Sequence, residues 1–409
     1  MKVCVFGLWH LGTVTAACVA SLGHEVAGLD LDETTIERLG RGEPPLYEPG
    51  LAELVREGLG NGNLHFTTDR REALKAARVL WVTFDTPVDD EDRADVDFVI
   101  KQVESVLDSV EPETIVLISS QLPAGTIRHL EQSHPRVSFA CSPENLRLGK
   151  AIDAFLKPDR IVAGTRNENQ RKIISELLEP LHARIEWMSV ESAEMTKHAL
   201  NAFLGTSIAF INEIAVACEA VGADAQEVAR GLKTDARIGP RAYLSPGVPF
   251  SGGTLARDIE FLRSSAALPL IAGVKESNDL HKTWVRRKLQ AVLGELKGKT
   301  IAVWGLTYKP GTDTLRRSAS VELCRELVAQ NARVNAHDPM VKSLPPELEG
   351  VRLCNTAEEA VRDAEALVVA TEWPEYKTAP VPPGLIVVDP NRFIGAREGV
   401  RYFSVGMAS

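Results

Sequence analysis

The stretch VFGLWHLGTV, residues 5–14, decides how this chain of 409 residues folds. An apolar run precedes it and a helical pattern follows it, with Gly7 and Gly12 at the bend between the two. A strand, a glycine turn and a helix in this order form the turn that holds the pyrophosphate of a dinucleotide at a helix N-terminus. The middle glycine of that motif lets the backbone approach the pyrophosphate, and here Trp9 occupies its position.

The acidic residue that completes such a turn is Asp30, which ends the run EVAGLD and lies 18 residues after Gly12. A carboxylate at this point accepts hydrogen bonds from the adenosine ribose. Leu31 and Asp32 follow it and offer no cation for a 2′-phosphate. We therefore expect NAD rather than NADP, with Trp9 turned aside or packed against the adenosine. The alternative is a turn of the same shape that has lost its ligand, because the fingerprint alone is a weak motif.

Short, fully apolar runs alternate with helical patterns up to about residue 190 and again after about residue 297. Runs of this kind are strands of a parallel sheet that is buried on both faces. The sequence therefore predicts an α/β fold, with two doubly wound Rossmann-like domains joined by a central helical region. The expected boundaries are 1–190 for the NAD-binding domain, 191–296 for the helical region and 297–409 for the second α/β domain. The two α/β halves are too dissimilar to indicate a duplication.

Composition limits the class of protein. The chain is 44% hydrophobic and 25% charged with a formal net charge of -10, and no dense Lys/Arg run indicates a nucleic-acid or membrane surface. Its six cysteines contain no CxxC pair, so we expect neither disulfides nor a metal site, and a reducing cytoplasm. The apolar N-terminus is interrupted by glycines and runs into acidic residues, which favours a buried strand and helix over a signal peptide. No uninterrupted apolar run is long enough for a membrane span.

Two stretches in the middle of the chain carry candidate chemistry. In CSPENLRLGK, Glu144 follows a strand, at the edge where open α/β sheets bind ligands. In AEMTKHALNAF, Lys197 and Asn201 are four residues apart on one helical face, so both side chains can point at one oxygen. The plainer alternatives are that Glu144 caps a turn and that Lys197 extends its ammonium into solvent.

Two later stretches add further candidates. The Gly/Pro-rich segment RIGPRAYLSPGVPFSGGTLARD is expected to be a loop that ends at Asp258. In GLTYKPGTDTLRRS, Lys309 and Arg316 lie between a strand and a helix, a suitable seat for a diphosphate. The alternatives are that Asp258 is a helix N-terminal charge and that Arg237, Lys309 and Arg316 are solvated surface charges.

Together with EPPLYEPGL (43–51), HDP (337–339) and ATEWPEY (370–376), these stretches resemble the nucleotide-sugar 6-dehydrogenase family along essentially the whole chain. That family includes UDP-glucose and GDP-mannose dehydrogenases. The resemblance implies an NAD-binding domain, a central helical dimerisation region and a UDP-sugar-binding domain. It also implies two successive hydride removals from the C6 hydroxyl of a nucleotide sugar, and a homodimer formed through the central helices.

The resemblance implies roles for individual residues. Lys197 and Asn201 would stabilise the developing alkoxide, Asp258 would take a proton through a water, and Glu144 would organise hydration. The residues at cofactor positions are Gly7, Trp9, His10, Leu11, Gly12, Asp30, Thr83, Thr86, Ser120 and Arg316. The residues at positions along the nucleotide sugar are Leu146, Arg147, Arg237, Tyr243, Leu244, Gly247, Tyr308 and Lys309. Among these, Arg237 matches an arginine that the family supplies from the neighbouring subunit.

The chain departs from the family where the family presents a nucleophilic cysteine, because Thr254 occupies that position. A threonine hydroxyl is a far weaker nucleophile than a thiolate, so we do not expect the thioester route of the family. Arg257 replaces a family lysine, Gln121 a threonine and Leu148 a glutamate. A thiol relocated to Cys141 is an alternative, although cysteines at strand ends are usually inert.

Several outcomes therefore stay open. The chain would stop at the 6-aldehyde, or oxidise the aldehyde as its hydrate, or bind a sugar nucleotide without turnover. A hydroxyacid dehydrogenase is a further alternative, which shares the lysine and asparagine helix but has no use for the domain after residue 297.

Overall fold

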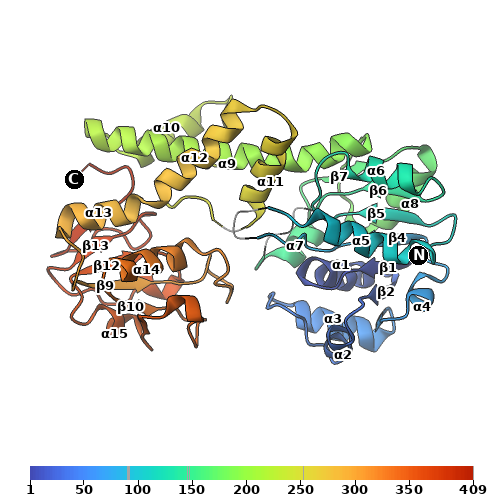
Figure 1. Cartoon of the computed structure of the whole chain (residues 1–409), viewed down its shortest axis with the longest axis horizontal. Helices are drawn as coiled ribbons and strands as arrows, with labels where there is room; N and C mark the ends of the chain where they lie inside the picture. The colour runs from blue at the N-terminus through green and yellow to red at the C-terminus, as the bar shows by residue number, and fades with distance from the viewer. Residues whose placement is uncertain (90–92, 145, 147, 252, 409) are drawn as a thin grey trace. The chain divides into compact units, whose positions relative to one another are not determined.

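The computed structural model describes residues 1–89, 93–144, 146, 148–251 and 253–408, with the backbone alone at Gly253. The chain forms two compact units, Met1–Ala199 and Leu200–Ser409. Each unit contains one sheet (Figure 1). The expected α/β fold class is confirmed, whereas the three-part division at residues 190 and 296 stays a prediction.

Among the described residues, the sheet of the first unit has eight strands in the order β3-β2-β1-β4-β5-β6-β7-β8. Neighbours pair in parallel, except β6 and β7, which pair antiparallel. The order of the first six strands is that of a dinucleotide-binding sheet, whose switch point lies between β1 and β4. The strands are β1 (Lys2–Phe6), β2 (Glu25–Leu29), β3 (Leu64–Thr67), β4 (Val79–Val82), β5 (Ile115–Ile118), β6 (Ser138–Cys141), β7 (Ile161–Gly164) and β8 (Ile185–Met188).

Both faces of this sheet are buried. In β1, Val3 and Val5 belong to one hydrophobic cluster, and Cys4 and Phe6 belong to another on the opposite face. The other strands and the helices on each face supply the rest of each cluster. Burial on both faces explains the fully apolar strands of the sequence. The helices are α1 (His10–Ser21), α2 (Glu33–Gly40), α3 (Leu51–Asn61), α4 (Arg70–Leu74), α5 (Val96–Leu107), α6 (Thr126–Ser133), α7 (Ala151–Leu156) and α8 (Glu168–Leu178), with the 3₁₀ turn η1 (Glu179–Leu181).

Helix α9 (Val190–Val221) begins in the first unit and continues in the second, and it covers the first part of the helical region expected over 191–296. Among the described residues, α9 is the one helix whose length and apolar composition would allow it to cross a membrane. A third of its most apolar window, 33%, is buried within the chain. Core helices of globular proteins meet the same criterion, so this feature alone does not assign α9 to a membrane.

The second unit contains a parallel sheet of six strands in the order β11-β10-β9-β12-β13-β14, as far as the described residues extend. Its strands are β9 (Thr300–Trp304), β10 (Arg333–His337), β11 (Val351–Leu353), β12 (Ala366–Val369), β13 (Ile386–Val388) and β14 (Arg401–Phe403). Its further helices are α10 (Ala225–Thr234), α11 (Gly253–Ser265), α12 (Pro269–Lys282), α13 (Trp284–Leu293), α14 (Ala319–Ala329) and α15 (Ala357–Val361), with the turns η2 (Pro346–Leu348) and η3 (Pro374–Lys377). Near the end of the helical region expected over 191–296, the two helices α12 and α13 meet at Thr283.

The two sheets share a strand order and a turn, a likeness that the sequence does not reveal. Gly7 after β1 and Gly305 after β9 both have a φ of 94°. In each unit the N–H that follows this glycine donates to the aspartate after the next strand, at 2.7 Å to Asp30 and at 2.8 Å to Asp338. The turn depends on one glycine and one aspartate, too few residues to register as a repeat.

Candidate active site

The turn after β1 has room for glycine alone at two positions. Gly7 adopts a positive φ of 94°, which favours glycine. A Cβ on Gly12 would lie 1.9 Å from the carbonyl oxygen of Gly7, so the first turn of α1 packs directly on the bend. The buried Thr83 hydroxyl, after β4, donates to the carbonyl oxygens of Phe6 and Gly7 at 3.0 Å each. Gly7, Gly12 and Thr83, three of the expected cofactor residues, are therefore in direct contact at this turn.

Asp30 connects this turn to β2. One carboxylate oxygen accepts from the N–H of Leu8 at 2.7 Å, the other accepts from the N–H of Asp32 at 3.1 Å, and the residue is half-buried. Helix α1 begins without a side-chain cap, so its first N–H groups are oriented for an anion. A turn that a Cβ would fill, an uncapped helix N-terminus and a carboxylate at the second strand together fit the pyrophosphate and ribose of NAD.

Trp9 is the N-cap residue of α1 in an extended conformation, and 50% of it is exposed. Its neighbour His10 faces the protein, where ring Nε2 lies 2.9 Å from the buried carboxylate of Glu48. Leu11 is buried. The indole is thus directed away from the core that surrounds the turn.

The loops after β4 and β5 are joined at the same edge of the sheet. The Thr86 hydroxyl donates to the carbonyl oxygen of Gln121 at 2.6 Å. Ser120 is buried, and its hydroxyl has no hydrogen-bond partner within the part of the chain that the structure describes. An unpartnered hydroxyl at this edge is available to a ligand or a water. Arg316, the remaining expected cofactor residue, lies exposed between β9 and α14 in the second unit.

Lys197 lies against the segment after β6. Its ammonium donates to the carbonyl oxygen of Glu144 at 2.6 Å, and the residue is 8% exposed. The alternative that the ammonium extends into solvent is therefore wrong. The carboxylate of Glu144 accepts from the N–H of Leu146. This bond caps the turn, as in the alternative that the sequence left open for Glu144. Arg147, an expected substrate residue, lies outside the described residues.

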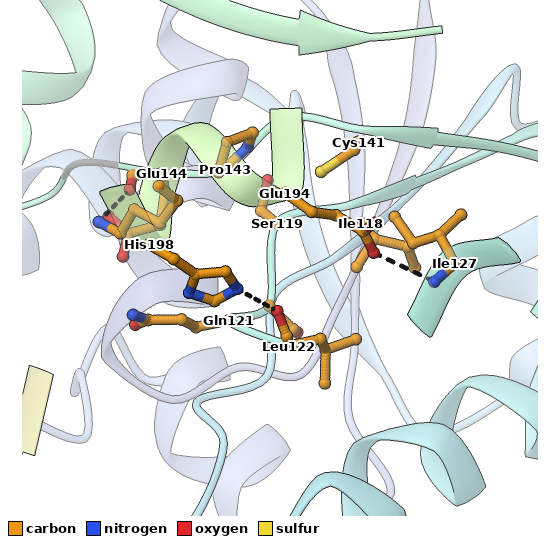
Figure 2. A pocket seen from close by; sticks show the side chains of 12 residues that line it. Ile118, Ser119, Gln121, Leu122, Ile127, Cys141, Pro143, Glu144, Glu194 and His198 are labelled. Carbon is orange, nitrogen blue, oxygen red and sulfur yellow. Dashed lines mark hydrogen bonds between the residues drawn. The ribbon is translucent and has the colours of Figure 1, made fainter. Parts of the chain in front are cut away.

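A cavity of about 20 Å³ lies beside Lys197, with Ser120, Gln121 and Glu144 among its lining residues (Figure 2). A space of this size holds one water molecule. Figure 2 also shows Glu194, which the sequence analysis did not single out. Its buried carboxylate accepts from the N–H groups of Gly125 and Ile127 at 2.7 and 3.1 Å, although burial raises its pKa.

In the second unit the side-chain amide of Asn201 donates to the carboxylate of Asp258. Both residues are buried, with 5% and 0% exposure. The segment expected to be a loop up to Asp258 in fact becomes helical at Gly253, and the first turn of α11 contains no acidic residue. Asp258 therefore lies inside the helix, and the alternative that it is a helix N-terminal charge is wrong. Thr254 is exposed and lies one turn before Asp258, on the same face.

The loop that precedes α11 is held by side chains that the sequence analysis missed. Asn391 and Asn278 accept from the N–H groups of Val248 and Phe250 at 2.8 and 2.9 Å. Ring Nε2 of His281 lies 2.8 Å from the carbonyl oxygen of Gly247, and burial lowers the pKa of this histidine. These three residues lie 28 or more positions beyond their partners in the loop, and no spacing rule relates them to it.

Gly247 is required at its position, because a Cβ there would lie 2.1 Å from the side-chain oxygen of Asn391. Its N–H donates to Asn212 of α9 at 3.0 Å. Of the expected substrate residues nearby, Leu244 is buried and Tyr243 is 53% exposed. Arg237 has a side chain that is 89% exposed and pairs with Asp235 at 2.7 Å.

The loop after β9 carries the last two expected substrate residues. The ammonium of Lys309 lies 5.2 Å from the centre of the Tyr308 ring, and burial raises the pKa of Tyr308 to about 12. The base of the loop is held by Asp338, which accepts from the N–H groups of Leu306 and Thr307 at 2.8 and 3.0 Å.

The fold and these groups are those of an NAD-dependent dehydrogenase, and the comparisons with known proteins agree. The chain matches the NAD binding domain of the UDP-glucose/GDP-mannose dehydrogenase family over residues 1–182, the central domain over 191–279 and the UDP binding domain over 302–395. The chain belongs to the UDP-glucose/GDP-mannose dehydrogenase family. Family membership, the NAD cofactor and the oxidoreductase class predicted from the sequence are thereby confirmed, and the hydroxyacid dehydrogenase alternative is wrong.

Individual relatives cover nearly the whole chain. UDP-glucose 6-dehydrogenase YwqF of Bacillus subtilis is 33% identical over 99% of this chain and 98% of its own length. UDP-glucose 6-dehydrogenase TuaD of the same species is 35% identical over 92% of this chain and 84% of its own length. The structure of a UDP-glucose dehydrogenase from Pyrobaculum islandicum superposes with a TM-score of 0.92, at 31% identity, and covers 100% of this chain and 98% of that one.

Proposed function

We propose that this chain oxidises the C6 hydroxyl of a UDP-sugar, with NAD as the hydride acceptor. The observation that carries the proposal is the pair of held residues on α9. Lys197 is bonded to the Glu144 carbonyl and Asn201 to the Asp258 carboxylate, and the two lie one helical turn apart. UDP-glucose is the first substrate to test, because the relatives named above are UDP-glucose 6-dehydrogenases.

In the proposed step the C6–H bond breaks, its electron pair leaves as hydride, and a C6=O bond forms while the hydroxyl proton is lost. Bound NAD supplies the hydride acceptor. Lys197 and Asn201 would donate to the oxygen as it becomes an alkoxide, and Asp258 would receive the proton through a water. Glu144 would hold the segment after β6 in place, since its carboxylate already caps that turn.

We further propose that the loops with Gly247 and with Tyr308 and Lys309 bind the nucleotide sugar. Both loops are anchored by buried side chains, which pre-organises them for a ligand. Arg237 would act on the sugar of a neighbouring subunit, because its side chain is almost fully exposed.

The aldehyde is the proposed main product of the first oxidation. A thioester route needs an accessible thiolate, and all six cysteines of the chain are free and buried. Burial raises the pKa of Cys141 well above its ordinary value, so this residue does not replace the missing nucleophile. Thr254 takes the family position of that nucleophile, with a hydroxyl that ionises far less readily. Any acid would then form when the aldehyde hydrate loses a second hydride and a proton.

A second candidate function is the binding of a sugar nucleotide without turnover. Thr254 and Trp9 favour it, since Thr254 stands in place of the nucleophile and Trp9 in place of the glycine that lets the backbone approach the pyrophosphate. Thermal stabilisation by a UDP-sugar, without formation of NADH, would support this candidate.

We propose that two copies associate through α9, with no nucleic acid or membrane as partner. Phe203, Phe210 and Val221 are 68, 47 and 78% exposed, and their spacing places them on one face of the helix. Exposed apolar faces of this kind are typical of subunit interfaces. Light scattering of the wild type and of a Phe203→Glu variant tests the association, because the variant is expected to be monomeric. The six free cysteines are consistent with the proposed reducing cytoplasm.

The experiment that tests the activity is incubation of the purified protein with NAD and a panel of UDP-, GDP- and TDP-sugars. We expect NADH from a UDP-sugar. A Lys197→Met variant, which keeps the length of the side chain but loses the ammonium, is expected to lose about 10²-fold or more in kcat. Absence of NADH with every sugar would contradict the proposed function.

A further inference from the structure

The loop between α2 and α3 contains a carboxylate that is almost fully enclosed. The side chain of Glu48 is 1% exposed, and three donors surround it. One oxygen accepts from the N–H of Ala151 at 2.8 Å, and the other from the N–H of Gly149 at 2.7 Å and from ring Nε2 of His10 at 2.9 Å. Because a carboxylate only accepts, Nε2 of His10 carries a proton.

These donors come from two segments on different parts of the sheet. His10 is the first residue of α1, in the turn after β1. Gly149 and Ala151 follow Glu144 in the segment after β6, and Ala151 is the first residue of α7. Strands β4 and β5 lie between β1 and β6, so the sheet itself does not join the two segments. Both segments lie at the carboxyl edge, where open α/β sheets bind their ligands.

A buried charge at this point requires an explanation beyond packing. Taking a carboxylate out of water is unfavourable unless hydrogen bonds replace its solvation, and an apolar side chain would fill the space without that cost. Charge-assisted bonds to three donors make the arrangement possible and hold it in one geometry. Lys150, the N-cap residue of α7, makes no side-chain capping bond. The carboxylate of Glu48 caps the helix instead, by accepting from the N–H of Ala151.

We propose that Glu48 is a positioning residue that couples the cofactor turn to the segment carrying Glu144. This inference rests on the proposed function, in which that turn binds NAD and that segment lies beside Lys197. Through Glu48, the orientation of the His10 ring and the position of the Glu144 segment depend on one another. Binding of NAD at the turn therefore favours the arrangement of the segment that the reaction uses, and the reverse.

The test compares Glu48→Gln with Glu43→Gln, a matched control in the same loop whose side chain is 53% exposed and pairs with Arg38 and Arg41. Both carboxylate oxygens of Glu48 accept hydrogen bonds. In Glu48→Gln one of them becomes an amide N–H₂, which donates and therefore cannot accept from the same partners. We expect Glu48→Gln to lower kcat about 10²-fold, the size of effect that a small misplacement produces, and to weaken NAD binding. Glu43→Gln is expected to behave as the wild type in both.

A double-mutant cycle between Glu48 and His10 separates the coupling of the two segments from a general loss of stability. His10→Phe removes the donor, whereas His10→Gln keeps an N–H₂ that can reach Glu48. The effects of His10→Phe and Glu48→Gln on NAD affinity, measured by quenching of tryptophan fluorescence, are expected to be non-additive. His10→Gln is expected to restore most of the affinity that His10→Phe loses, and all variants are checked for an unchanged thermal transition.

The outcomes distinguish this proposal from the proposed function. A wild type that binds and reduces NAD, with Glu48→Gln equal to Glu43→Gln or with strictly additive effects in the cycle, overturns the role of Glu48 alone. A wild type that binds NAD without turnover contradicts the proposed activity, while the affinity cycle still decides whether Glu48 couples the two segments. A wild type that binds no NAD overturns both.

Discussion

The side-chain amide of Asn201 donates a hydrogen bond to the carboxylate of Asp258, and both groups are enclosed by the protein. This bond fixes which end of the Asn201 amide faces Asp258, and it joins α9 to α11.

Replacement of Asn201 tests this relationship. Asn201→Ala removes one donor to the proposed alkoxide and leaves the buried Asp258 without its amide partner, so we expect kcat to fall about 10²- to 10³-fold. Asn201→Asp is expected to be at least as damaging, because it places a second carboxylate beside the first. Steady-state kinetics check both variants. Full activity in either would exclude the assigned role.

Thr254 offers a test by gain of function. The residue is exposed in the first turn of α11, where the helix N-terminus favours a thiolate. We expect Thr254→Cys to shift the product from aldehyde to acid and to raise the NADH formed per sugar from about one to two. Thr254→Ser is the control and is expected to leave the product unchanged. An acid as main product of the wild type would refute the proposed stop at the aldehyde.

Two glycines of the first unit with opposite surroundings, Gly12 and Gly40, test the turn. Gly12→Ala would place its Cβ 1.9 Å from a backbone oxygen, so we expect a loss of about 1–3 kcal/mol in the free energy of unfolding and weaker NAD binding. Gly40 in α2 has open space around its missing Cβ, and Gly40→Ala is expected to stabilise by about 0.4–1 kcal/mol. Urea unfolding and NAD titration measure both. Equal stability of the two variants would argue against the close contact.

His281 makes the stability of the second unit depend on pH. Burial lowers its pKa, so the unfolded chain takes up a proton at a higher pH than the folded chain. Its contribution is complete above the ordinary histidine pKa of 6.5 and is lost as pH falls below that value. His281→Gln keeps a donor for Gly247 and does not titrate, so its free energy of unfolding should fall less between pH 7.5 and 5.5. Burial also lowers the pKa values of His24 and His337. Both histidines are present in the wild type and in the variant, so they contribute equally to the pH dependence of the two proteins.

The parts of the fold that follow from local pattern are those the sequence predicts. Short apolar runs predict β1, β2, β4 to β10, β12 and β13, and the helical pattern that begins near residue 190 predicts α9. Strands β3, β11 and β14 have three or four residues and mostly half-buried side chains, so no apolar run marks them. The sequence does not predict that Asp258 lies inside a helix, because the glycine pair 252–253 indicates a loop. The helix in fact begins at Gly253.

The residues of the candidate site also divide into those that local spacing predicts and those that it does not. Lys197 and Asn201 are found from helical spacing, and Asp30 from its distance to the glycine turn. Glu48, Asn278, His281 and Asn391 act through contacts between segments far apart in the chain, and spacing contains no signal for such contacts. The motif EPPLYEPGL contains Glu48, but only the structure relates its carboxylate to His10 and Ala151.

The most direct test of the central claim is mass analysis of a UDP-glucose reaction with NAD and the purified protein, together with the amount of NADH formed. We expect NADH and a UDP-sugar that is lighter by the mass of two hydrogens, and we expect an aldehyde reagent to convert this product into its C6 adduct. An unchanged UDP-sugar and no NADH, repeated with the other UDP-sugars, would contradict it.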